Sequence, residues 1–130
     1  MTAVYVDTSA LGRVLLGEPQ ARSILRALGR FDQHVASRLA SVELRRLALR
    51  HDCLTQAVAL LKGVALLPLD EELLDAAATL APLVVGTLDA IHLATALTLS
   101  REGLLDSLMT YDAHLAKAAA KHGLAVAAPR

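Results

Sequence analysis

Four acidic side chains of this 130-residue chain occur where the local pattern could put a carboxylate to chemical use. Asp7 and Asp112 each end a short apolar run, Asp89 lies in the first turn of a long apolar segment, and Glu43 lies beside an apolar helix row. Clustered carboxylates remain ionised together only when a cation neutralises them. Oxygen-only ligands favour Mg²⁺ or Mn²⁺, and such a site binds phosphates and activates water for phosphodiester hydrolysis.

Each acid also has a purely structural interpretation. Asp7 or Thr8 could simply cap the helix that follows, and a first-turn acid such as Asp89 usually complements the helix dipole. The helix around Asp89 is too apolar for an ordinary surface helix, so we expect Asp89 to face a polar cavity. Taken alone, Glu43 is expected to pair with Arg46, three residues further along the same helix.

The rest of the chain alternates between short apolar runs and helical patterns, which predicts an α/β fold with a mostly parallel central sheet. The predicted strands are 3–6, 33–36, 64–67, 107–110 and 124–127. The predicted helices are 11–16, 19–28, 38–50, 54–62, 71–81, 88–100 and 113–121, with Ser37, Asp70 and Thr87 as N-caps. Right-handed crossovers bring strand ends and helix N-termini to one edge of such a sheet. Asp7, Asp89 and Asp112 are therefore expected at the same edge.

Composition indicates one globular domain over residues 1–130, because 55% of the residues are hydrophobic and 20% are charged. Its net charge is zero, so any nucleic-acid surface must be local. Two tyrosines and one phenylalanine are too few for a base-stacking platform. The candidate phosphate contacts are Arg22, Arg26, Arg30, Arg46 and Arg50, although the first three could equally form a solvated helix face.

Cys53 is the only cysteine, which excludes an internal disulfide and suits a reducing compartment. Neither a signal peptide nor a membrane span is evident, so a cytoplasmic protein is expected. The segment Leu54–Lys62 has only a thin polar strip, so either the core or a second chain should cover most of it. His92 could be a metal ligand or a base, but a hydrogen-bonded helix histidine is the expected role.

Four segments in this order resemble the PIN-domain family, specifically the VapC-type toxins of bacterial type II toxin–antitoxin pairs. They are Val6-Asp7-Thr8-Ser9-Ala10-Leu11, Ser41-Val42-Glu43-Leu44, Leu88-Asp89-Ala90-Ile91-His92-Leu93-Ala94-Thr95-Ala96 and Thr110-Tyr111-Asp112-Ala113-His114-Leu115. Each motif alone is weak, whereas all four in this order span nearly the whole chain and are specific.

The resemblance implies a three-layer α/β/α fold and a Mg²⁺- or Mn²⁺-dependent endoribonuclease. Carried over residue by residue, it makes Asp7, Glu43, Asp89 and Asp112 the catalytic and metal-binding acids, with Thr8, Ser9 and Thr110 as supporting hydroxyls. It also implies an RNA substrate, a VapB-type antitoxin whose tail covers the groove, and a homodimer, which the apolar segment Leu54–Lys62 fits.

Two other functions are compatible with part of this pattern. A phosphotransferase of the haloacid-dehalogenase kind would need an aspartate two residues after Asp7, but position 9 is Ser9. A catalytically silent PIN-like domain acting as a scaffold would share the fold but lack a specific divalent-ion site. Metal titration separates that scaffold from the nuclease.

Overall fold

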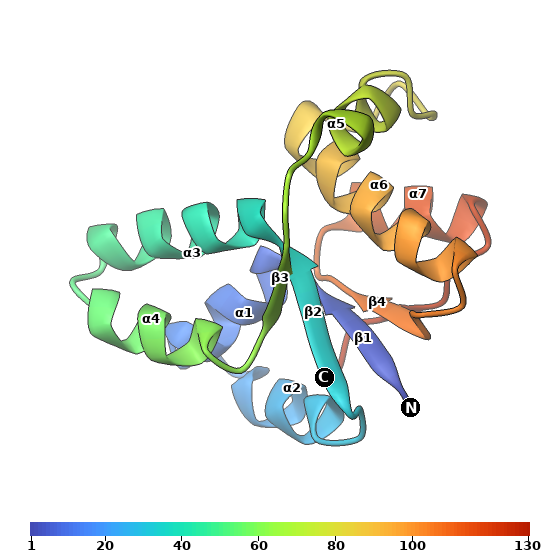
Figure 1. The fold of residues 1–130 in the computed structure, drawn as a ribbon. Coiled ribbons are helices and arrows are strands. Elements are labelled where there is room, and N and C mark those ends of the chain that lie inside the picture. Colours follow the sequence, from blue (N-terminus) through green and yellow to red (C-terminus); the bar gives the residue numbers. More distant parts are fainter.

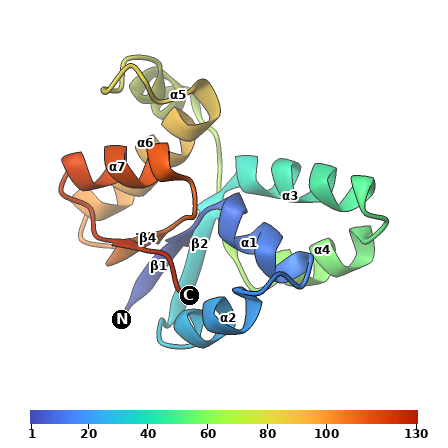
Figure 2. The same ribbon diagram turned by 180° about the vertical axis from the view of Figure 1, so that it is seen from behind.

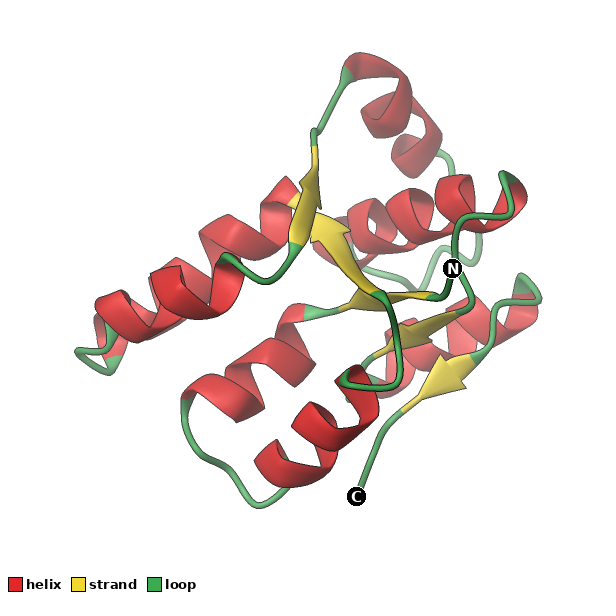
Figure 3. Ribbon diagram, turned by 60° about the horizontal axis from the view of Figure 1, so that its bottom comes forward, coloured by secondary structure: helices red, strands yellow, loops and turns green.

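A five-stranded parallel sheet forms the centre of the computed structural model, which describes residues 1–130. The strands are Ala3–Val6 (β1), Gln33–Ser37 (β2), Ala65–Leu67 (β3), Ser107–Met109 (β4) and Val126–Ala127 (β5). Their order across the sheet is β3-β2-β1-β4-β5, and all four neighbouring pairs are parallel. The strands fan out across the twisted sheet, with β1 in the middle (Figure 3).

Helices cover both faces of this sheet (Figures 1 and 2). They are Thr8–Leu15 (α1), Ala21–Leu28 (α2), Arg38–Arg50 (α3), Leu54–Leu61 (α4), Glu71–Ala78 (α5), Thr87–Arg101 (α6) and Ala113–Lys121 (α7). Helices α6 and α7 lie on one face and α1, α2 and α4 on the other, while α5 packs on α6. The three-layer α/β/α prediction is therefore confirmed.

The alternation of β1 explains the two cores. Tyr5 points to the face covered by α6 and α7, where it packs with Leu93 and Leu115. Val4 and Val6 point to the opposite face and join the core formed by α1, α2, α3 and α4. Because the strand is buried on both faces, its sequence is continuously apolar until Asp7.

Capping side chains begin several helices where the sequence indicates. Ser37 accepts a hydrogen bond from the N–H of Leu39 at the start of α3, and Asp70 accepts one from Leu73 in α5. Helix α6 begins one residue earlier than predicted, with Gly86 rather than Thr87 at the N-cap position. None of the helices combines the length and apolar character needed to cross a bilayer.

Candidate active site

Asp7 is the first residue after β1, at the C-terminal edge of the sheet. It is only 5% exposed, and its Oδ2 accepts hydrogen bonds of 2.8 Å from the hydroxyls of Ser9 and Thr110. These hydroxyls are held in turn, because the N–H of Tyr111 donates to Ser9 and the N–H of Asp112 donates to Thr110. Asp7 occupies the N-cap position of α1, but its side chain accepts no capping hydrogen bond from a backbone N–H of that helix. The capping interpretation of this carboxylate is therefore wrong.

Asp89 and Asp112 lie close to Asp7 at this edge. Oδ1 of Asp112 caps α7 by accepting hydrogen bonds from the N–H groups of His114, at 2.8 Å, and Leu115, at 3.1 Å. Burial, followed by the neighbouring carboxylates of Asp112 and Asp7, raises the pKa of Asp89 to about 6. Like charges have this effect only at short range, so the β1 and β4 ends and the first turn of α6 meet in one acidic cluster.

Glu43 reaches the cluster from α3 through one carboxylate oxygen. Its Oε1 accepts a hydrogen bond of 2.8 Å from the hydroxyl of Thr8 and lies 2.6 Å from Nε2 of His92. The same His92 nitrogen lies 3.7 Å from Oδ1 of Asp7, so the histidine links these two acids. The expected ion pair with Arg46 is wrong: the ion-pair partner of Glu43 is His92. Helical spacing could not reveal partners supplied by α1 and α6.

The protonation states of this group follow from its contacts. Burial alone would raise the pKa of Glu43, but the hydrogen bond and charge of His92 and the hydroxyl of Thr8 lower it below its usual value. Burial opposes the charged form of His92, yet the hydrogen bond to Glu43 and the nearby carboxylates raise its pKa. Glu43 is therefore ionised at neutral pH, whereas the raised pKa of Asp89 lets it hold its proton more readily than an ordinary aspartate does.

In three of the carboxylates, the protein forms hydrogen bonds with only one of the two oxygens. Oε1 of Glu43, Oδ2 of Asp7 and Oδ1 of Asp112 each accept two hydrogen bonds from the protein. The second oxygen of each accepts no hydrogen bond from a hydroxyl or a backbone N–H. One oxygen therefore fixes the orientation of each side chain, and the other remains available to a ligand.

This donor set fits a hard divalent cation, because it offers only oxygens and concentrates negative charge. Burial and the neighbouring charges of Asp112 and Asp7 together raise the pKa of Asp89, as expected where carboxylates lie close together. As the side chains stand, however, no three His, Cys, Asp or Glu residues surround a common point as metal ligands would.

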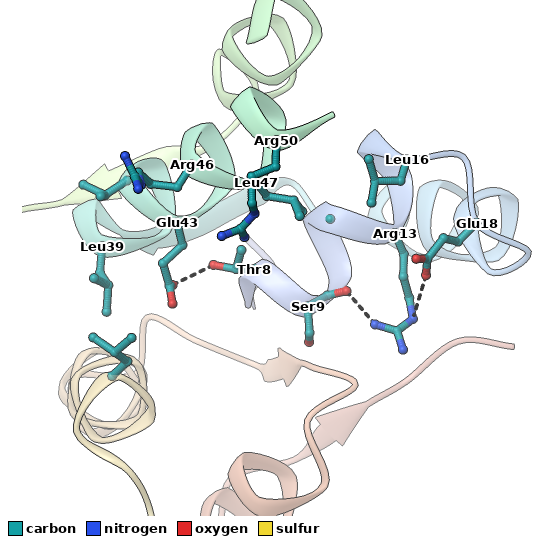
Figure 4. A pocket seen from close by; sticks show the side chains of 13 residues that line it. Thr8, Ser9, Arg13, Leu16, Glu18, Leu39, Glu43, Arg46, Leu47 and Arg50 are labelled. Carbon is teal, nitrogen blue, oxygen red and sulfur yellow. Dashed lines mark hydrogen bonds and ion pairs between the residues drawn. The ribbon is translucent and has the colours of Figure 1, made fainter. Parts of the chain in front are cut away.

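An open groove of about 600 Å³ runs between α1, α3 and the start of α6, beside the acidic cluster. Of the four acids only Glu43 lines it, together with Thr8, Ser9, Arg46, Arg50 and Leu88. Figure 4 shows Glu43 turned toward Thr8 and the side chains of α3 and α1 on either side of the groove. A phosphodiester backbone lying in this groove would contact Arg46 and Arg50 and would pass the carboxylate of Glu43.

The remaining arginine candidates lie elsewhere. Arg26 and Arg30 line a separate hollow of about 460 Å³ beside the C-terminal residues 127–130, and Arg22 is exposed on the same helix. Two residues near the site were not singled out from the sequence, Tyr5 and Arg13. Tyr5 lies two residues before Asp7 and so on the same face of the strand, a signal that was present in the sequence.

Known proteins resemble this chain over nearly its whole length. The family model of the PIN domain matches residues 4–121. The chain is 36% identical over 133 residues to "Ribonuclease VapC47" of Mycobacterium tuberculosis (strain CDC 1551 / Oshkosh), covering 97% of this chain and 96% of that protein. It is 37% identical over 131 residues to "Ribonuclease VapC46" of Mycobacterium tuberculosis (strain ATCC 25618 / H37Rv), covering 99% of both.

Solved structures share the fold. A toxin–antitoxin complex from Klebsiella pneumoniae contains a chain that superposes with a TM-score of 0.76, with 22% identity and 98% coverage of both chains. The crystal structure of Mycobacterium tuberculosis VapC20, described as a sarcin–ricin-loop-cleaving toxin, gives a TM-score of 0.68 with 17% identity. The alignment covers 88% of this chain and 94% of VapC20.

Proposed function

The chain belongs to the PIN-domain family, and we propose that it is a VapC-type toxin, an endoribonuclease that hydrolyses RNA phosphodiester bonds at an acidic Mg²⁺ or Mn²⁺ site. One observation carries the proposal: hydroxyls from α1 and from the end of β4 hold the buried Asp7 carboxylate beside the other acids of this edge. Burial, together with the neighbouring carboxylates of Asp112 and Asp7, raises the pKa of Asp89 to about 6. The full-length relatives named ribonucleases support the same activity.

In this proposal Asp7, Asp89 and Asp112 hold the cation. When bound, the cation stabilises charge at the phosphate and lowers the pKa of water. Ser9 and Thr110 fix Asp7 through Oδ2, so that Oδ1 is the oxygen left for a ligand. Glu43, ionised at neutral pH because of its lowered pKa, either adds a further ligand or orients the attacking water.

The groove beside the cluster suits two occupants. Arg46 and Arg50 would contact RNA phosphates near Glu43. In the absence of RNA, we propose that a cognate VapB-type antitoxin covers the same groove with its tail. Its apolar side chains would lie on Val42 and Leu88, which are 51% and 52% exposed, and a basic side chain would face the acids. The Klebsiella chain, whose structure is described as a toxin–antitoxin complex, supports such a partner.

A second copy of the chain is the proposed occupant of the α4 surface. Only Ala57 and Leu61 of this helix are buried, whereas Leu54 and Val58 are 40% and 42% exposed. The core of the monomer therefore leaves the apolar side chains of Leu54 and Val58 uncovered. Homodimer formation would cover them.

The alternative is a catalytically silent PIN-like scaffold, which the lack of a preformed three-residue metal group favours. Calorimetric titration of the purified protein with Mn²⁺ separates the two functions. A nuclease should bind the ion at a saturable site that Asp89→Asn weakens, whereas a scaffold should show no such site. Sequencing RNA 5′ ends after expression would then identify the cleaved RNA.

A further inference from the structure

A buried chain of hydrogen bonds runs from the centre of the sheet to Glu43. The hydroxyl of Tyr5 lies 2.6 Å from Nδ1 of His92, and Nε2 of the same ring lies 2.6 Å from Oε1 of Glu43. Tyr5 and His92 are 0% and 1% exposed. We propose that His92, fixed by Tyr5, is a positioning residue that sets the orientation of the Glu43 carboxylate. This inference rests on the proposed ribonuclease function.

The direction of each hydrogen bond follows from the groups involved. The N–H of Ser37 donates to the oxygen of Tyr5, at 3.1 Å, and the phenol proton can donate to Nδ1 of His92 when the ring is neutral. An ionised carboxylate only accepts hydrogen bonds, so Nε2 of His92 must carry the hydrogen that it donates to Oε1 of Glu43. Nε2 carries this proton in both the neutral and the charged ring, so the contact does not depend on the charge of His92.

The contacts with His92 and Thr8 restrict the rotamers of the Glu43 side chain. Glu43 stands on α3 with its side chain 26% exposed, and a glutamate loses substantial rotamer entropy when it is held in place. His92 and Thr8 both donate to Oε1, so the carboxylate plane is fixed and Oε2 is left without a donor. The ring of Tyr5 meets His92 edge-on with centroids 5.8 Å apart, which fixes the imidazole in turn.

A histidine at position 92 can contact Tyr5 and Glu43 at the same time, which a side chain with a single donor nitrogen cannot do. Its two nitrogens lie on opposite sides of one rigid ring and join a buried phenol to a half-exposed acid. A glutamine at position 92 can place its amide near the Nε2 position, whereas an asparagine can place its amide only near Nδ1. The two variants therefore separate the contact with Glu43 from the contact with Tyr5.

The test compares His92→Gln, His92→Asn and His92→Leu in metal-dependent RNA cleavage, after melting curves confirm that each variant is folded. His92→Asn and His92→Leu should lower kcat by about 10- to 100-fold with little change in KM, as the loss of a group that orients a metal-site ligand does. His92→Gln should recover most of that loss. His34→Leu is the matched control, because His34 binds the backbone oxygen of Leu28 away from the acids. Equal activities of the Gln and Asn variants would overturn the proposal.

A second measurement does not depend on activity. The ¹⁵N NMR spectrum of the histidine rings should show His92 protonated at Nε2, with a proton resonance shifted downfield by the hydrogen bond. Glu43→Ala should move this resonance upfield. A ring protonated at Nδ1 alone, or a resonance unchanged in Glu43→Ala, would refute the positioning role even in a protein that cleaves RNA. Absence of cleavage by the wild type, with the NMR signals as expected, would instead contradict the ribonuclease function.

Discussion

At the scale of single residues, the four acids differ in how the protein holds them. Asp7 is buried and fixed by two hydroxyls, Glu43 by a hydroxyl and a histidine, and Asp112 by the backbone of the helix it caps. Asp89 is the acid whose neighbours disfavour its charge. The site therefore combines three carboxylates that are held by hydrogen bonds with one, Asp89, whose charged form is disfavoured by burial and by its neighbours.

Asp89 should make the metal-free protein less stable as the pH rises. Its pKa is about 6 in the folded state and near 3.8 when unperturbed, so the folded protein binds its proton more tightly than the unfolded chain does. The Asp89 contribution is favourable below about pH 4 and is lost as the pH rises through 6. Asp89→Asn should therefore melt higher than the wild type at pH 7 in chelator, with the difference shrinking toward pH 4. The same difference at both pH values would contradict the shared cluster.

The hydroxyl of Thr110 should matter for stability as well as for the site. Thr110→Val keeps the shape of the side chain but removes a donor to the buried Oδ2 of Asp7, which should cost about 1–3 kcal/mol of unfolding free energy. Thr98→Val is the control, because Thr98 is exposed and bonds only its own helix through Ala94. Denaturant titration at pH 7 measures both, and an equal effect of the two substitutions would show that Asp7 does not need this donor.

At the scale of elements, α3 and α2 present arginines in different settings. Arg46 and Arg50 share a groove with Glu43, whereas Arg22 and Arg26 of α2 do not. Replacing Arg46 or Arg50 by Gln should reduce the salt slope of RNA binding, measured in chelator, by roughly one unit. Arg22→Gln should leave the slope unchanged. The opposite ranking would place the RNA path along α2.

Regular periodicity allowed much of the fold to be predicted. The bounds of α3 and α7 agree with the apolar spacing, and all five strands lie within or close to the predicted runs. Helix α1 begins at Thr8 rather than at Leu11. The prediction missed its first turn because Thr8 and Ser9 are residue types that favour helix caps and turns. Helix α5 ends at Ala78, three residues before the predicted end.

Sequence reasoning was less successful with side-chain partners. The motifs singled out the acids, and the parallel topology explains why three of them meet. The partner of Glu43 depends on how α3 and α6 pack, which no local spacing encodes, and so the sequence suggested Arg46 and gave no sign of His92. Tyr5 was not singled out from the sequence, although its hydroxyl has two buried partners.

At the scale of the whole molecule, α4 exposes the apolar side chains of Leu54 and Val58 to solvent in the monomer. Val58→Asp should disrupt a homodimer by placing a charge in the interface, without disturbing the core beneath it. Leu104→Asp is the control, since Leu104 is 57% exposed beyond the end of α6. Sedimentation velocity should show a dimer for the wild type and the control, and a monomer for Val58→Asp. A monomeric wild type would exclude the dimer.

The central claim is that the edge of the sheet holds one metal-dependent nuclease site, and RNA cleavage by Asp7→Asn tests it most directly. The amide keeps the size of Asp7 but supplies a poorer, uncharged ligand. The purified wild type should cleave RNA with Mg²⁺ or Mn²⁺ and lose this activity in chelator. Asp7→Asn, shown to be folded by its melting curve, should cleave at least about 100-fold more slowly under the same conditions. Cleavage by folded Asp7→Asn at the wild-type rate would contradict the assignment of the site.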